Sequence, residues 1–292
     1  MFFLDFLHLI YLHIPLHILN PELFLLDETG YPKEVAGVPP DYFSEDGQKW
    51  GNPLYDWEKN KETGFKWFME RFERMMHLYD YTRLDHFRGY EAYFSIPVNE
   101  KAIKGMWRKS LGEEVLKAAH ERYGPLPFIA EDLGFITYAV KKLMKEFDFS
   151  GMSVLQFFDG NIYDYTCKPD RIAYTGTHDN EMLYSFIKDN LVKGVVDADG
   201  CEDDAEEISD KISKEITRVF DILMDRVYES DAKVVIVPLQ DAAMLDNNAR
   251  MNTPGSVDRN WCWQATEADL IKAGKRLDLE TEKFNRKKVE KS

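Results

Sequence analysis

Tyr81-Thr82-Arg83-Leu84-Asp85-His86-Phe87-Arg88-Gly89 is a short run of strand-forming residues that ends in charged side chains and a glycine. Side chains alternate along a strand, so Arg83 and Asp85 are expected on the same face. A guanidinium beside a carboxylate favours the ionised form of that carboxylate. An ionised and oriented aspartate can act as a nucleophile, although a purely structural ion pair is the other interpretation of this stretch.

Two later stretches repeat this pattern. Residues 127–134 are an apolar strand that ends in acidic side chains and a glycine, and residues 172–180 are a third strand that ends in a polar cluster. The separations between Asp85, Glu131 and Asp179 leave room for one or two strand-and-helix units between each pair. Because chemistry gathers where the carboxyl ends of parallel barrel strands meet, these three carboxyl groups are predicted to converge at one mouth.

Strands and helices alternate along the rest of the chain. The strand predicted at residues 233–239 contains four successive β-branched residues, which is typical of a buried parallel strand. Such alternation predicts an α/β fold. Helices are predicted at residues 61–78, 113–122, 137–147, 181–191 and 208–228 and again from residue 265, and a further buried strand at 151–158.

Residues 20–57 show little regular periodicity and are rich in proline, glycine and aromatic residues. They are predicted to form a long loop, and a long loop inside a compact domain is usually functional. Its aromatic side chains are expected to form the walls of a groove, or else to pin the loop to the body of the protein. These residues are Tyr42, Phe43, Trp50, Tyr55 and Trp57.

The composition limits the class of ligand. The 292 residues carry a net charge of −15, which repels nucleic acid and anionic membranes and makes a neutral substrate the natural complement. Six tryptophans and fifteen tyrosines suit stacking against sugar rings, although core packing is the commoner use of such residues. The three cysteines are odd in number and lack a metal-binding pattern, which indicates a reducing compartment, so a cytoplasmic location is expected.

Three convergent carboxyl groups are the set that retaining glycosyl transfer uses. Asp85 would attack the anomeric carbon while Glu131 protonates the departing oxygen and then, as a base, activates the acceptor. Asp179 would hold hydroxyl groups of the distorted sugar, with His178 donating beside it. Water as the acceptor gives hydrolysis, and a sugar hydroxyl gives transfer; neither outcome is expected to need a metal or a cofactor.

The same residues carry a resemblance to the amylomaltases, the bacterial 4-α-glucanotransferases that are also called disproportionating enzymes. Three stretches resemble the nucleophile, acid/base and stabiliser motifs of that family, and three further blocks match it in the same order along the chain. The motif stretches are residues 83–89, 130–134 and 174–180, and the further blocks are residues 37–43, 51–57 and 249–255.

The resemblance implies a (β/α)8 barrel of the type found in α-amylase-like glycosidases, and it assigns roles to single residues. Asp85 is implied as the nucleophile, Glu131 as the acid/base and Asp179 as the stabiliser. The aromatic residues named above for the 20–57 loop would line a glucan groove. Further substrate-binding positions are implied at Arg83, His86, His178 and Asn180.

Members of the family are longer on the N-terminal side, so the chain is expected to hold about the last six strands of an incomplete barrel. Residues 1–19 are interpreted as a degraded or frame-disrupted strand segment, residues 20–264 as the barrel portion and residues 265–292 as a helical tail. Residues 161–170 are shorter than their family counterpart, and Gln264 stands where an arginine is usual. A barrel that lacks strands has unpaired edges, which predicts self-association or partial unfolding.

The predicted function is the transfer of α-1,4-glucan segments between maltodextrins, or to glucose, by a retaining double displacement. An α-glucan hydrolase of the related amylase type is one alternative, and a catalytically silent remnant that at most binds glucan is another. The expected partners are maltooligosaccharides and glucose, with no nucleic acid and no membrane.

Overall fold

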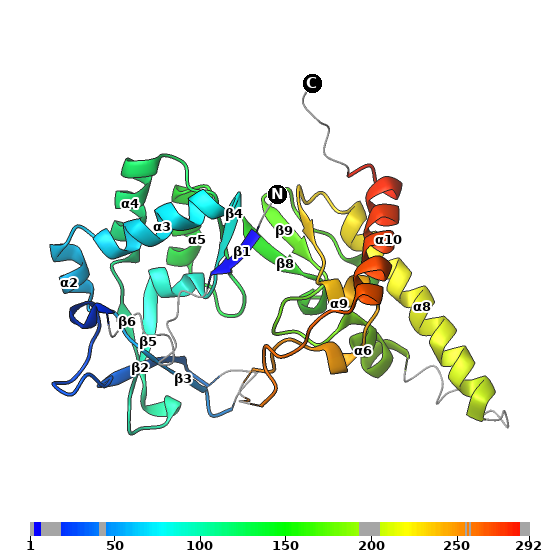
Figure 1. The fold of residues 1–292 in the computed structure, drawn as a ribbon, viewed down its shortest axis with the longest axis horizontal. Helices are drawn as coiled ribbons and strands as arrows, with labels where there is room; N and C mark the ends of the chain where they lie inside the picture. The colour runs from blue at the N-terminus through cyan, green and yellow to red at the C-terminus, as the bar shows by residue number, and fades with distance from the viewer. Residues whose placement is uncertain are drawn as a thin grey trace. The chain divides into compact units, whose positions relative to one another are not determined.

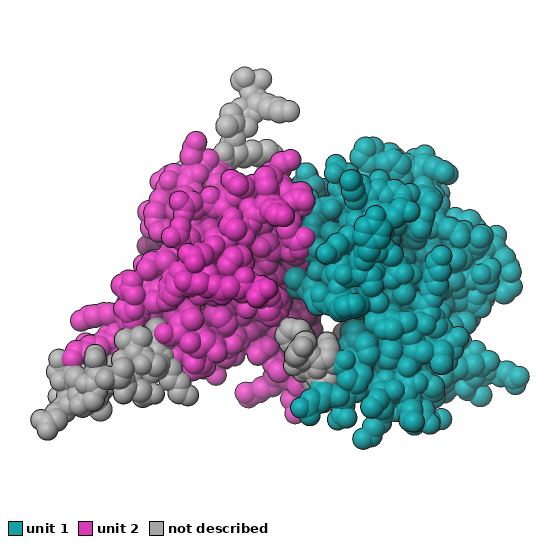
Figure 2. Space-filling model, turned by 180° about the vertical axis from the view of Figure 1, so that it is seen from behind, with its two compact units in different colours: residues 1–151 teal, residues 152–292 magenta. Residues whose placement is uncertain are grey.

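The computed structural model describes residues 3–6, 19–40, 45–192, 205–254, 256 and 258–286. The chain divides into two compact units, Met1–Gly151 and Met152–Ser292, which Figure 2 colours separately. Most of the segment 1–19, which the sequence analysis interprets as a disrupted strand, lies outside the described residues.

The first unit contains the strand that precedes Asp85. Strand β4 (Tyr81–Leu84) lies between β1 (Phe3–Phe6) and β7 (Phe128–Ala130), and all three strands run parallel. Leu84 is in register with Ala130, so the residues that follow them, Asp85 and Glu131, leave the sheet at the same edge. The strands predicted from the two motif stretches are therefore confirmed.

Three helices pack beside this sheet, as Figure 1 shows: α3 (Lys66–Leu78), α4 (Gly112–Tyr123) and α5 (Tyr138–Glu146). Buried apolar side chains from these helices and from β7 form one core, in which the rings of Phe72 and Phe128 lie 5.0 Å apart. The helices predicted at 113–122 and 137–147 are confirmed. The one predicted at 61–78 is divided into α2 (Trp57–Glu62) and α3, because Gly64 and Phe65 both adopt the left-handed backbone conformation.

The region predicted as a long loop contains two strands, so that prediction is wrong. Strands β2 (Glu34–Val38) and β3 (Gln48–Pro53) join β5 (Ala92–Pro97) and β6 (Met106–Lys109) in an antiparallel sheet of order β3-β2-β5-β6. At Gly37 a Cβ atom would lie 2.1 Å from the carbonyl oxygen of Gln48. Glycine therefore permits the close pairing of β2 with β3, although glycine weakens the strand signal in a sequence.

The second sheet has the order β10-β9-β8 and consists of β8 (Gly151–Val154), β9 (Arg171–Tyr174) and β10 (Val235–Ile236), of which β9 and β10 run parallel. The strand predicted at 151–158 is shorter than expected, since it continues as a 3-10 turn at Leu155–Phe157. The strand predicted at 233–239 is also short, because α9 (Leu239–Ala242) begins directly after Pro238. Apart from this turn, short 3-10 helices span Pro21–Leu23, Phe87–Tyr90, Ala102–Lys104, Ile162–Asp164 and Asn247–Ala249.

The helices of the second unit confirm three predictions, with shifted ends. They are α6 (Leu183–Ile187), which continues as a π-helix at Lys188–Val192, α8 (Ala205–Glu229) and α10 (Glu267–Lys283). Side chains of α8, α6 and β9 share a buried core that includes Phe220 and Leu183. No helix among the described residues is long and apolar enough to cross a membrane. Both units thus have mixed α/β structure, with parallel strands alternating with helices.

Candidate active site

Asp85 and Glu131 lie side by side at one edge of the parallel sheet in the first unit. Nη1 of Arg83, on β4, is 2.7 Å from Oδ1 of Asp85. The Arg83 and Asp85 side chains are 8% and 16% exposed, so water screens this ion pair only weakly. The alternation of side chains along β4 brings the two groups together, and the guanidinium stabilises the negative charge of the carboxylate.

The carboxyl group of Glu131 is held by two backbone amides. Oε2 accepts a hydrogen bond of 2.7 Å from the backbone N–H of His86, and Oε1 accepts one of 2.8 Å from that of Leu133. Burial raises the pKa of Glu131 to about 7, an effect that the charge of Arg83 opposes and that of Asp85 reinforces. Near neutral pH this group can therefore both hold and release a proton, as a general acid/base must.

His86 connects the two carboxyl groups through its backbone. Its φ angle of 46° is left-handed, a conformation that is uncommon for residues other than glycine and that is often found at functional sites. Burial lowers the pKa of the imidazole to about 4, and the charge of Arg88 acts in the same direction. The ring is therefore neutral at physiological pH and adds no positive charge beside Glu131. The ring of Trp50, on β3, stands nearly perpendicular to it with centroids 5.0 Å apart.

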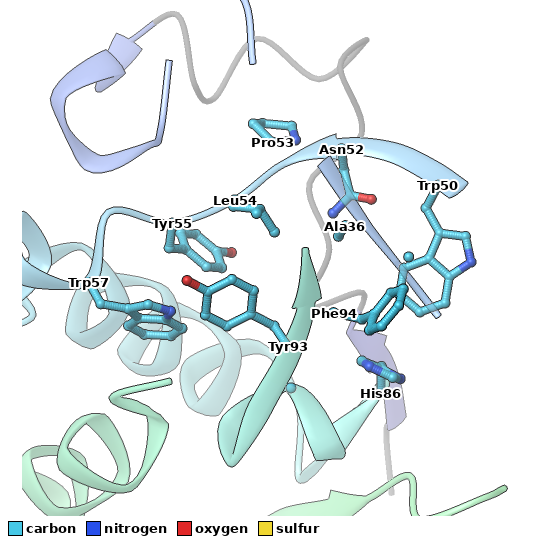
Figure 3. Close-up of a pocket in the computed structure, with 12 residues that line it drawn as sticks. Ala36, Trp50, Asn52, Pro53, Leu54, Tyr55, Trp57, His86, Tyr93 and Phe94 are labelled. Carbon is cyan, nitrogen blue, oxygen red and sulfur yellow. The ribbon is translucent and has the colours of Figure 1, made fainter. Parts of the chain in front are cut away.

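A narrow pocket adjoins His86 in the first unit (Figure 3). Its free volume is about 30 Å3, far below the roughly 300–1,000 Å3 of a typical ligand pocket. Trp50 and His86 lie toward one end, and Tyr55, Trp57 and Tyr93 toward the other. The side chain of Asn52 also lines the pocket, and its buried Oδ1 has no hydrogen-bond partner among the described residues.

The predicted groove aromatics occupy different environments. Tyr55 and Trp57 are only 7% and 8% exposed and pack with Phe68 in the core of the first unit, while they also line the narrow pocket. Trp50 is partly exposed beside His86. Tyr42 and Phe43 lie outside the described residues. The assignment of these five residues to a glucan groove stays a prediction.

Asp179 lies in the second unit, in the loop that follows β9. Its Oδ1 accepts a hydrogen bond of 2.5 Å from the side-chain amide of Asn252, and its backbone carbonyl accepts one of 2.6 Å from Arg250. Nε2 of His178 is 3.3 Å from Oδ2 of Asp179, and its ring lies against Trp261. The Asp179 side chain is 43% exposed, so this carboxylate is held in place and still faces solvent.

Asn180 holds the same loop from the inside. It is 5% exposed, and its Oδ1 accepts hydrogen bonds from the backbone N–H and the hydroxyl of Thr177, at 2.9 and 2.8 Å. Its Nδ2 donates to Oε1 of Gln156, and Nε2 of Gln156 donates to the carbonyl of Glu181. In this structure the Asn180 side chain therefore organises the loop, and the substrate contact predicted for it stays a prediction.

Several residues that surround Asp179 in the second unit have no role predicted from the sequence. Arg250 and Asn252 contact Asp179 from the loop that precedes α10. Asp241 lies in α9, shortly after the last strand. Burial raises the pKa of Asp241 to about 6, while hydrogen bonds from Leu183 and Thr175 oppose that shift. The only signal for Asp241 in the sequence is its place two residues after a predicted buried strand.

The geometry defines a class of protein. A carboxylate paired with an arginine, next to a carboxyl group that exchanges its proton near neutral pH, is the pair that enzymes acting on glycosidic bonds use. No group of three or more His, Cys, Asp or Glu side chains in the described part of the chain could hold a metal ion. The chain matches the family model described as 4-alpha-glucanotransferase over residues 18–269, and it belongs to that family.

Curated relatives carry the same family name. The 4-alpha-glucanotransferase of Thermus thermophilus is 38% identical over 86% of this chain and 51% of its own length. That of Synechocystis is 41% identical over 84% of this chain and 48% of its own length. The chloroplastic/amyloplastic enzyme of Solanum tuberosum is 36% identical over 91% of this chain and 45% of its own length. The chain thus spans about half the length of the curated relatives it matches.

Solved structures agree with this assignment. The amylomaltase from Streptococcus agalactiae in complex with acarbose superposes with a TM-score of 0.80 at 31% identity, covering 98% of this chain and 58% of that one. An amylomaltase from Corynebacterium glutamicum superposes with a TM-score of 0.70 over 93% of this chain and 44% of that one. The latter is only 15% identical and therefore supports the fold alone.

Proposed function

We propose that this protein is a retaining 4-α-glucanotransferase, which moves segments of α-1,4-glucan between maltodextrins or to glucose. The observation that carries the proposal is the environment of Glu131, where burial raises the pKa to about 7 beside an Asp85 carboxylate paired with Arg83. Two neighbouring carboxyl groups with different proton affinities are what double displacement needs. The family membership and the relatives named above support the same reaction.

In the first step, a carboxylate oxygen of Asp85 bonds to the anomeric carbon of the donor glucan. The bond from that carbon to the departing sugar oxygen breaks, and Glu131 gives its proton to this oxygen. In the second step, Glu131 takes a proton from the acceptor hydroxyl, whose oxygen bonds to the anomeric carbon and displaces Asp85. Two inversions leave the configuration of the donor unchanged, so the product is again an α-glucan.

The other predicted residues take supporting roles in this proposal. Asp179 stabilises the positive charge that develops on the sugar ring and holds its hydroxyl groups, and its bond from Asn252 fixes the carboxylate for that task. His178 donates beside it. Arg83 and His86 maintain the charge and the orientation of the two reacting carboxyl groups, and Trp50 provides an aromatic wall for the glucan.

The proposed architecture is an incomplete (β/α)8 barrel that contains about the last six strands. Its supports are the parallel strand pairs in the two units and the likeness to the Streptococcus agalactiae amylomaltase. The division into a disrupted segment 1–19, a barrel portion 20–264 and a tail 265–292 belongs to this proposal, as do a cytoplasmic location and self-association through strand edges. Light scattering of the purified chain measures the self-association.

The deciding experiment is incubation of the purified chain with maltotriose, followed by analysis of glucose and of longer maltodextrins. Transfer produces a ladder of longer and shorter products. In the Asp85→Asn variant, the rate at which these products form is expected to fall by a factor of about a thousand or more. Products that are all shorter than maltotriose would indicate an α-glucan hydrolase. Binding of maltodextrin by a folded sample without any turnover would indicate a silent remnant, and either result overturns the proposal.

A further inference from the structure

One buried carboxylate holds both ends of the loop that carries Asp179. Oδ2 of Asp241 accepts a hydrogen bond of 2.7 Å from the hydroxyl of Thr175, at the end of β9. Oδ1 of the same residue accepts one of 2.8 Å from the backbone N–H of Leu183, the first residue of α6. Asp241 is 1% exposed and Thr175 is fully buried, so water does not compete for these bonds.

The backbone between these two anchors also passes close to Asp241. A Cβ atom added at Gly176 would lie 3.6 Å from Oδ2 of Asp241 and 3.1 Å from Nε2 of Gln156. Within the loop, Asn180 bonds to Thr177, as described above. The N–H of Met182 donates to the side chain of Asn247 at 2.8 Å. The loop is therefore fixed at its start, its middle and its end, and Asp241 provides the first and the last of these anchors.

The two acceptor oxygens of the Asp241 carboxylate are what this arrangement requires. A carboxylate can accept hydrogen bonds at both oxygens, whereas an asparagine offers one acceptor and one donor group. Burying a charged group is unfavourable unless hydrogen bonds compensate for the lost water. At this position each carboxylate oxygen accepts a hydrogen bond from one end of the same loop. The side chain therefore fixes the loop through directed bonds and does more than fill space in the core.

We propose that Asp241 is a positioning residue for the transfer reaction. It closes the loop at residues 176–182 so that His178 and Asp179 are presented to the sugar in a fixed orientation. The expected effect on the rate rests on the proposed function, because it assumes that Asp179 contacts the sugar during transfer. The arrangement of the loop itself can be tested without any turnover.

The test compares Thr175→Val with Thr175→Ser. Valine keeps the shape of threonine and removes the hydroxyl, whereas serine keeps the hydroxyl and loses only the methyl group. For maltotriose disproportionation, Thr175→Val is expected to lower kcat at least tenfold with KM changed less than about threefold, and Thr175→Ser is expected to stay within about twofold of the wild type in both. Asp278→Asn, which removes an exposed carboxylate on α10, is the control for loss of charge in the Asp241→Asn variant used below.

Amide hydrogen exchange of residues 177–182 is measured on the same samples. Faster exchange in Thr175→Val, with Thr175→Ser unchanged, is expected; equal kcat and equal exchange in the two variants overturns the inference. If Thr175→Val does not fold, Asp241→Asn replaces it, and wild-type kcat together with wild-type exchange in that variant overturns the inference. If the wild type does not act on maltotriose, the proposed function fails, and the exchange data alone decide whether Asp241 fixes the loop.

Discussion

At the scale of single residues, the carboxyl group of Glu131 links the chemistry of the site to the stability of the fold. Its pKa is about 7 in the folded protein, against an ordinary value of 4.5. The neutral form is therefore favoured on folding. The stability that this group contributes is fully present below about pH 4.5 and is lost as the pH rises through about 7.

Replacing Glu131 by glutamine removes this titration. The melting temperature of Glu131→Gln is expected to increase relative to the wild type by about 2–6 °C between roughly pH 5 and pH 8. Calorimetry at several pH values measures the difference. Glu121→Gln, an exposed position on α4, is the matched control and should follow the wild type at every pH. A Glu131→Gln curve parallel to that of the wild type would contradict the raised pKa.

Part of the site could be predicted from single residues, and part could not. Arg83 and Asp85 were expected to pair because strand side chains alternate, and the structure shows that pair. The left-handed backbone of His86, whose N–H donates to Glu131, could not be predicted from the sequence, because only a small fraction of histidines adopt that conformation. The buried state of Asp241 depends on partners that are 58 and 66 residues away along the chain.

At the scale of elements, helix α10 offers a test of local stability. Thr266 and Asp269 form a capping box at its start, in which each side chain bonds to the backbone N–H of the other residue. Arg276 of α10 then pairs with Asp221 of α8 at 2.7 Å, so the helix is also anchored along its length. Its first turn therefore depends on the cap, and the rest depends on packing.

Thr266→Ala is expected to lower the free energy of unfolding by about 1 kcal/mol, because the backbone N–H of Asp269 loses its acceptor. Denaturant titration of the purified chain measures this change. Thr217→Ala in the interior of α8 is the control, since threonine is a weaker helix former than alanine there and its loss should be neutral or slightly stabilising. Equal destabilisation by both substitutions would mean that the cap contributes nothing.

The elements that could be predicted are those with strong local patterns. The helices α4 and α5 have clear apolar periodicity and clear ends, and both were found close to the expected residues. Strands β2 and β3 were missed because β2 pairs with β5, which is more than forty residues further along the chain, and because Gly37 and Gly51 weaken the strand pattern. Long-range pairing of short strands is not encoded in local periodicity.

At the scale of the whole molecule, the net charge of −15 leads to a prediction about salt. A maltooligosaccharide carries no charge, so its binding should not depend on screening of the protein's charge. The dissociation constant for maltoheptaose is expected to change less than about twofold between 50 and 500 mM NaCl, as measured by calorimetry. A steep dependence on salt would indicate a charged ligand and would count against a neutral glucan.

The two carboxyl groups and the aromatic ring beside them belong to different sheets of the first unit. The parallel strands β4 and β7 fix the two carboxyl groups, whereas Trp50, on β3, supplies the aromatic ring that meets His86 beside them. Substitutions in β3 therefore alter the surface next to the chemistry without disturbing the strands that carry it. In evolutionary terms, variation in one sheet can change the preference among sugars that we propose for this chain, while the proposed reaction stays the same.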